Sequence, residues 1–289
     1  EFSREIISSG DVPEAVNEID KGEVKETDSF ALWQQFVISN RDKHGIDYLS
    51  LREQTAASED LTVVVDSMHG ASRLHIEKLL GDGKKKLTML RKEKNVSFGG
   101  VAPEPSSRNM KGVTENLGSS GERLKIGAII DPDGDRIRFT DGSTEISMNQ
   151  FGALAYFFLH EYKGKRGMVA KTVATSNMAN SVAEKLGEEV YEPRVGFKEF
   201  KPVIGKALVM FEESDGISVI GHTPEKDAYI GLLLALDMTL STGKNLGTLK
   251  QELEEKFGVF CPDRDGVEVS LKGKELQEAL EKLGKYSEN

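Results

Sequence analysis

Short apolar runs that alternate with helical stretches are the feature that most restricts the fold of this chain. Helical patterns separate these runs, and strands separated by helices form βαβ units with mainly parallel pairing. The sequence therefore predicts an α/β fold, with two tandem α/β domains built on mainly parallel, mixed sheets flanked by helices. The strand-like runs occupy residues 61–66, 87–90, 125–130, 168–171, 189–192 and 207–211.

The 289 residues suffice for two such domains with flanking sequence. We expect the first domain at residues 60–145 and the second at residues 146–258. Residues 1–59 are interpreted as the last helices of a preceding domain plus a linker, and residues 259–289 as a connection to a following one. The absence of an initiator Met favours a piece of a longer chain. Helices are expected at about residues 29–39, 72–80, 108–116, 148–162, 176–186, 198–204, 226–240 and 246–257.

Charge and composition exclude several classes of protein. The formal net charge of −10 argues against a broad nucleic-acid surface, which needs clustered Lys and Arg. The longest apolar stretches are too short to span a bilayer, so no membrane partner is expected. The single cysteine, Cys261, excludes an internal disulfide, and a reducing cytoplasmic location follows as the default.

An acidic loop follows the third strand-like run directly. Asp131, Asp133 and Asp135 alternate there, and Arg136 comes next. Open α/β sheets place their ligands at the carboxyl ends of strands, and Mg²⁺ prefers oxygen ligands such as carboxylates. The alternative is a solvated acidic turn, but regular alternation straight after an apolar strand favours a cation site. The three aspartates are therefore predicted to bind Mg²⁺.

Several stretches resemble, in order, the motifs of one enzyme family. The loop matches an Asp-x-Asp-x-Asp-Arg pattern, and the chain from about residue 60 to residue 258 is similar to the α-D-phosphohexomutases, the phosphoglucomutases and phosphomannomutases. Members have four domains, with a phosphoserine in the first and a phosphate-clamping loop in the fourth. Neither of those motifs occurs here, so the resemblance is to the central domains 2 and 3. The matching stretches are Pro103-Glu104-Pro105, Asp131 to Arg136, Lys171 to Ser176, Val195 to Lys198, Glu212-Glu213-Ser214 and Gly221 to Asp227.

The resemblance implies an isomerase that interconverts hexose 1-phosphate and hexose 6-phosphate through phosphoserine and a bisphosphate intermediate. Arg136 and Lys171 are the implied catalytic cations. Lys171 has an alternative role as an ordinary residue at a strand end, and the Glu212 loop could be a plain turn. Asp215 stands where Gly is common in the family, which leaves the loop's path and the preferred hexose open. The implied substrate-binding residues are Gly196, Phe197, Lys198, Glu212, Ser214, His222 and Lys226.

The absence of the phosphoserine motif and of the phosphate-clamping motif determines which activity we expect of this chain. The predicted partners are a hexose phosphate and the first and fourth domains of the same enzyme. Because the phosphoserine would also be a metal ligand, the chain alone is expected to bind Mg²⁺ weakly and to have little mutase turnover. A non-catalytic metal- and phosphosugar-binding or scaffold protein with the same fold is the alternative.

Overall fold

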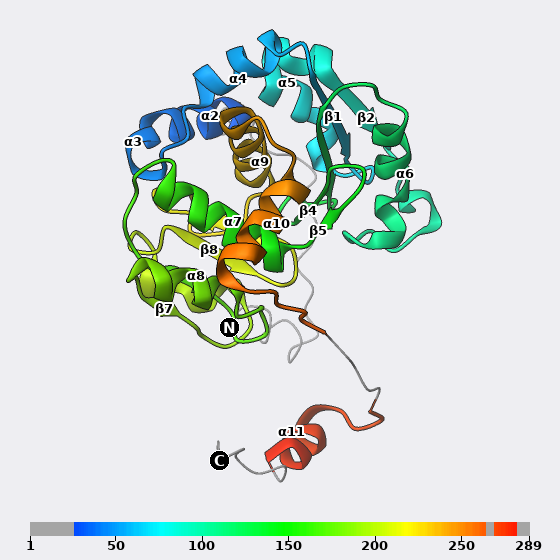
Figure 1. Ribbon diagram of the computed structural model, residues 1–289. Coiled ribbons are helices and arrows are strands. Elements are labelled where there is room, and N and C mark those ends of the chain that lie inside the picture. Colours follow the sequence, from blue (N-terminus) through cyan, green and yellow to red (C-terminus); the bar gives the residue numbers. More distant parts are fainter. Residues whose placement is uncertain (1–25, 264–268, 282–289) are drawn as a thin grey trace.

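Two mixed β-sheets with helices packed around them organise the chain (Figure 1). The computed structural model describes residues 26–263 and 269–281. Sheet A has the strand order β2-β1-β3-β4-β5, and sheet B has the order β7-β6-β8-β9. The strands are β1 (Leu61–Asp66), β2 (Leu87–Leu90), β3 (Leu124–Ile130), β4 (Ile137–Thr140), β5 (Glu145–Ile146), β6 (Val169–Lys171), β7 (Val190–Tyr191), β8 (Val209–Glu212) and β9 (Gly216–Val219).

The helices surround both sheets (Figure 1). None of them, within the described residues, is long and apolar enough to cross a membrane. The last, α11, lies apart from the rest of the chain and has no buried residue. The α-helices are α2 (Ser29–Ser39), α3 (Arg41–His44), α4 (Tyr48–Ala57), α5 (Ile76–Leu80), α6 (Ser107–Gly118), α7 (Met148–Glu161), α8 (Met178–Leu186), α9 (Ala228–Thr242), α10 (Leu246–Phe257) and α11 (Gly273–Glu281).

Each sheet joins a parallel half to an antiparallel edge. In sheet A, β1 pairs in parallel with β2 and β3, whereas β4 runs antiparallel to β3 and β5. In sheet B, β6 pairs in parallel with β7 and β8, and β9 runs antiparallel to β8. The predicted α/β fold with two mixed sheets flanked by helices is confirmed.

Helix α9 joins the two sheets into one core. It is apolar on all sides and eleven of its residues are buried, as expected for a helix surrounded by protein. Gly231 lies where the packing is tightest, because a Cβ there would be 2.8 Å from Ile137 of β4 and 3.1 Å from Ile217 of β9. The helix thus touches the antiparallel edges of both sheets, and buried residues of both belong to one apolar cluster.

The predicted helix at residues 29–39 is confirmed as α2, which packs on the N-terminal end of α9. The indole Nε1 of Trp33 donates a 2.6 Å hydrogen bond to Oδ2 of Asp227, the residue before α9. The Trp33 ring also meets Tyr229 edge-on, with centroids 5.7 Å apart. The part before residue 26 of the segment 1–59, interpreted as the last helices of a preceding domain plus a linker, lies outside the described residues.

Two predicted helices are 3₁₀ rather than α-helical over part or all of their length. The segment expected at 72–80 begins as a 3₁₀ helix, Ala71–Leu74, and becomes α-helical only at Ile76. The segment expected at 198–204 is a 3₁₀ helix, Phe197–Val203, which contains Pro202. Proline has no N–H to donate and its ring clashes with the carbonyl four residues earlier, so an α-helix is disfavoured there. Among the α-helices and strands of the described residues, the prediction missed α3, α4, β4, β5, β9 and α11.

The buried His44 makes stability depend on pH. Its Nδ1 accepts a 3.1 Å hydrogen bond from the Ile46 N–H, and its Nε2 lies 3.1 Å from the carbonyl of Val37. These partners suit a neutral ring with its proton on Nε2, because a second proton on Nδ1 would face another donor. Burial lowers the pKa of His44 to about 4.

We predict that His44 destabilises the fold in acid. The unfolded chain takes up a proton near pH 6.5 and the folded chain only near pH 4, so stability present above pH 6.5 is lost as the pH falls between these values. The loss reaches up to about 3 kcal/mol. Urea unfolding from pH 7 to pH 4 measures it, with His44→Gln as the control that lacks this titration. Equal pH slopes for the two proteins would contradict the prediction.

Candidate metal centre and adjoining cavity

The three predicted metal ligands lie together at the carboxyl end of β3. One oxygen or more of each of Asp131, Asp133 and Asp135 falls within 4.8 Å of the others. The turn is closed by a 3.1 Å bond from the Gly134 N–H to the Asp131 carbonyl. Gly134 has a φ of +84°, a conformation that glycine adopts without steric cost.

Asp131 is the buried member of this aspartate loop. Its Oδ1 accepts bonds from the backbone N–H groups of Asp135 (3.1 Å) and Arg136 (2.9 Å), and its Oδ2 accepts a 2.6 Å bond from Arg136 Nε. Burial nevertheless raises the pKa of Asp131 to about 6, and the charges of the other two aspartates contribute. A group of three carboxylates that repel one another fits a hard divalent cation, which would favour their charged forms.

The turn after β1 packs directly against the aspartate loop. The Ala71 N–H donates a 2.7 Å bond to the Pro132 carbonyl. At Gly70 the two segments come so close that a Cβ would lie 2.3 Å from the Pro132 Cα. The loop therefore rests directly on backbone, with no room for a side chain between them.

Backbone bonds join the aspartate loop to sheet B. Arg136 forms an isolated antiparallel bridge with Gly216 at the start of β9. The Ile137 N–H donates to the Asp215 carbonyl (2.8 Å), and the Ala228 N–H donates to the Gly134 carbonyl (3.1 Å). We call these contacts, between residues 134–137 and residues 215–228, the backbone seam. The seam places the start of β9 and of α9 beside the aspartates.

Lys226 lies beside the aspartates at this seam. Its Nζ is 2.9 Å from Asp135 Oδ2. Burial by itself would lower the pKa of Lys226, but the bond and the charge of Asp135 raise it overall, and Glu212 adds to this effect. Lys226 is thus a charged ammonium that interacts both with Asp135 of the aspartate loop and with Glu212 of the predicted sugar loop.

The predicted sugar loop lies between β8 and β9. Glu212 is buried and accepts a 2.9 Å bond from the Gly196 N–H. Burial raises the pKa of Glu212, although the Gly196 bond and Lys226 oppose the rise. Ser214 is half-buried at the tip of the turn. The structure therefore brings Gly196, Glu212 and Lys226 together, as a single binding region requires.

A cavity of about 500 Å³ opens beside this loop. Its volume lies within the range of roughly 300–1,000 Å³ of ordinary small-molecule sites. Glu213, and not Glu212, faces it; the Glu213 carboxylate is held at 3.0 Å by the Thr172 hydroxyl. The cavity-lining residues are Arg138, Ser147, Asn149, Ala174, Val195, Glu213, Pro262 and Asp263.

The structure gives Lys171 and His222 other contacts. Lys171 is fully buried, and its Nζ lies 2.5 Å from Glu192 Oε2 and 2.8 Å from Asn177 Oδ1. His222 is buried too, with its Nε2 2.7 Å from Asp227 Oδ2. These contacts orient neighbouring segments, and the catalytic or substrate roles of both residues remain predictions.

Phe197 and Lys198 point to different environments. Phe197 is buried against Phe200, with ring centroids 5.0 Å apart and planes perpendicular. Lys198 is exposed. The Phe197 side chain therefore packs on the inner side of the turn, whereas the Lys198 side chain is exposed on the outer side of the turn. Contact of either residue with substrate stays a prediction.

The predicted site residues leave out three residues that shape the site, Arg138, Glu213 and Asp227, although Glu213 and Asp227 lie within two of the matching stretches. Asp227 accepts bonds from Trp33 and His222 and caps α9 through the Tyr229 N–H (2.7 Å). An Asp directly before a long apolar helix is a capping signal that could have identified it. Glu213 lies in the matching stretch Glu212-Glu213-Ser214, whereas Arg138 had no comparable signal.

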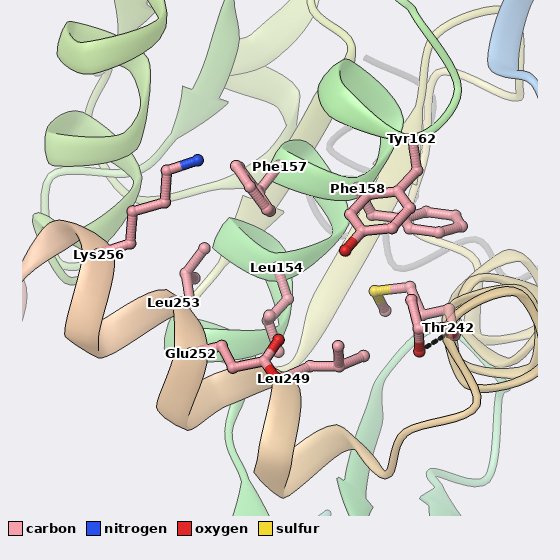
Figure 2. Close-up of a pocket in the computed structure, with 10 residues that line it drawn as sticks. Leu154, Phe157, Phe158, Tyr162, Thr242, Leu249, Glu252, Leu253 and Lys256 are labelled. Carbon is pink, nitrogen blue, oxygen red and sulfur yellow. Dashed lines mark hydrogen bonds between the residues drawn. The ribbon is translucent and has the colours of Figure 1, made fainter.

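A smaller cavity of about 180 Å³ lies between α7, α9 and α10. Figure 2 shows aromatic and aliphatic side chains around it, with Glu252 and Lys256 on α10. None of its described lining residues is a predicted site residue. Its walls are mostly apolar, so this cavity offers few groups for the metal and phosphate chemistry predicted from the sequence.

Comparison with known proteins identifies the family. Residues 45–144 match the phosphoglucomutase/phosphomannomutase alpha/beta/alpha domain II, and residues 147–257 match domain III. The chain belongs to the phosphoglucomutase/phosphomannomutase family. The fold of this family member is also that of a putative phosphomannomutase from Thermus thermophilus, with a TM-score of 0.69 and 26% identity over 81% of this chain and 52% of that one.

Curated relatives show how much of a family member is present. Phosphoglucomutase 1 of Drosophila melanogaster is 26% identical over 70% of this chain and 37% of its own length. A phosphoglucomutase/phosphomannomutase of Thermococcus kodakarensis is also 26% identical, over 68% of this chain and 43% of its own length. The chain thus spans less than half the length of these mutases.

We predict that Gly70→Ala disturbs the aspartate loop. The new methyl group would overlap the backbone of Pro132, and overpacking of this kind costs about 1–3 kcal/mol. Chemical denaturation measures the loss of stability, and titration with Mn²⁺ measures a weaker cation site. Gly118→Ala is the matched control, because a Cβ at Gly118 meets nothing within 4 Å. Equal effects of the two substitutions would contradict the packing explanation.

Proposed function

We propose that this chain provides the metal-binding and sugar-binding domains of a phosphohexomutase. The reaction is the interconversion of hexose 1-phosphate and hexose 6-phosphate, with the phosphoserine supplied from outside residues 1–289. The observation that supports this most strongly is the backbone seam, which sets the aspartate loop beside the turn that contains Glu212 and Ser214. Family membership supports the same reaction class.

The aspartate loop is proposed to hold Mg²⁺ through Asp131, Asp133 and Asp135. When bound, Mg²⁺ would offset phosphate charge and polarise phosphoryl oxygens. The oxygen-only ligand set suits this cation. Arg136 keeps the buried Asp131 oriented through two hydrogen bonds, and the remaining N–H groups of its guanidinium can face a phosphate.

The cavity beside Glu213 is proposed to receive the hexose. A carboxylate accepts hydrogen bonds from sugar hydroxyls, and a serine hydroxyl can both donate and accept them, so such a pair can hold either end of a hexose. Glu213 is already oriented by Thr172, and Ser214 lies next to it at the turn. Lys226, between Glu212 and Asp135, is placed to attract a phosphate group near the aspartates.

Cation binding tests the metal assignment. We expect the chain to bind Mg²⁺ or Mn²⁺ weakly, and Asp133→Asn to reduce the affinity at least about tenfold, since even outer-shell partners of a metal matter by that much. Isothermal titration calorimetry provides the measurement. Asp82→Asn, at an exposed aspartate of the segment Gly81–Lys86, is the control. Tight Mg²⁺ binding that survives Asp133→Asn would reject the site.

An assay of turnover tests whether this chain needs a phosphoserine from another domain to convert its substrate. We expect little conversion of glucose 1-phosphate by this chain alone, because its proposed residues bind and orient but provide no phosphoserine. A coupled dehydrogenase assay for glucose 6-phosphate measures it. Binding of glucose 1-phosphate without turnover agrees with the proposal. Rapid turnover by residues 1–289 alone would contradict it, and binding of neither the cation nor the sugar phosphate would favour a scaffold.

A further inference from the structure

Asp215 ends the sugar-loop turn in an unusual backbone conformation. It has a φ of +72°, which non-glycine residues rarely adopt, although Asp tolerates it better than most. Its N–H donates a 3.2 Å bond to the Glu212 carbonyl, and its own carbonyl accepts the Ile137 N–H of the seam. The path of the turn from Glu212 to Gly216 therefore depends on holding Asp215 in this conformation.

Arg138 of β4 forms an ion pair with the Asp215 side chain. Its Nε lies 3.1 Å and 3.3 Å from the two carboxylate oxygens, and its Nη2 lies 2.7 Å from Oδ2. The Asp215 side chain is only 3% exposed and that of Arg138 20%. A second carboxylate, Glu145 on β5, accepts a 3.2 Å hydrogen bond from Arg138 Nη1. The guanidinium is thus held in a fixed orientation between two carboxylates.

The ion pair of Arg138 with Asp215 lies between the two parts of the proposed site. Arg136 and Arg138 are two residues apart near the start of β4, so they project to the same face of the strand. Arg136 binds Asp131 of the aspartate loop, and Arg138 binds Asp215 of the sugar-loop turn. Arg138 also lines the cavity that Glu213 faces.

The contacts of Arg138 favour holding the turn over binding a phosphate directly. Each of its three nitrogens already donates a hydrogen bond to Asp215 or Glu145, so the group is already bound by protein carboxylates. A bidentate Arg–carboxylate pair fixes direction as well as distance. Removal of the guanidinium would leave the buried Asp215 carboxylate without its ion-pair partner, with the backbone N–H of Met148 as a remaining hydrogen-bond donor.

We propose that Arg138 is a positioning residue whose ion pair with Asp215 holds the turn of Glu213 and Ser214 against the aspartate loop. The proposal rests on the proposed function for its consequence, which is hexose binding in the adjoining cavity. Its structural part does not, because the pair would order the turn whether or not a sugar binds.

Hydrogen exchange tests the structural part. In Arg138→Met we expect the amides of Asp215 and Ile137 to exchange faster by about tenfold or more, since the bonds that protect them open more often. Amides of β1 and β2 should keep their rates. Arg108→Met, at an exposed residue of α6, is the control and should change neither set. Unchanged exchange of Asp215 and Ile137 in Arg138→Met would overturn the proposal.

A rescue variant separates positioning from direct contact. Asp215→Gly in the Arg138→Met background removes the unpaired buried carboxylate and supplies a residue that adopts positive φ freely. We expect the double variant to fold and to regain slow exchange at Ile137. Exchange as fast as in Arg138→Met would overturn the proposal, because the turn would then not depend on the conformation that the pair maintains.

Glucose 1-phosphate titration, followed by NMR, tests the consequence. We expect its affinity to fall several-fold in Arg138→Met and to return in the double variant. Loss in both variants would show that Arg138 binds the ligand itself and would overturn the positioning role. If the wild-type chain binds no glucose 1-phosphate, the proposed function fails, and the exchange measurements alone decide whether Arg138 holds the turn.

Discussion

The backbone seam between the aspartate loop and sheet B is the contact on which the rest of the site depends. Its hydrogen bonds join Gly134 to Ala228 and Ile137 to Asp215, and all of them use main-chain atoms that any sequence possesses. The residues of the core then pack at the spacing that these bonds fix. Gly231 allows α9 to pack on β4 and β9 at once, so the apolar core beneath the seam is shared by both sheets.

Charge balance is the second constraint on this region. Three aspartates within 4.8 Å would repel one another, and the fold offsets them with cations from different elements. Arg136 belongs to the loop itself, whereas Lys226 comes from the segment before α9. Asp227 fixes that segment from the other side through Trp33 of α2. A helix far away in sequence therefore contributes to the geometry of the aspartate loop.

The sequence predicted local features well and long-range ones poorly. The aspartate loop was found because one apolar strand runs directly into Asp131. The strand β4 was missed because four residues, with only one clear alternation, give too short a pattern. Asp215 was noticed as a departure from the family's glycine, but its partner Arg138 lies 77 residues away. No periodicity relates two such positions, and only the packing of the two sheets brings them together.

Paramagnetic relaxation by bound Mn²⁺ tests most directly whether the aspartate loop and the sugar-loop turn form one site. Mn²⁺ held by Asp131, Asp133 and Asp135 should broaden the amide signals of residues 215–217 and 226–228, because the seam keeps these segments beside the loop. Signals of α11, which lies apart from the rest of the chain (Figure 1), should stay sharp. Sharp signals at residues 215–217 in the presence of loop-bound Mn²⁺ would contradict a single, rigid site.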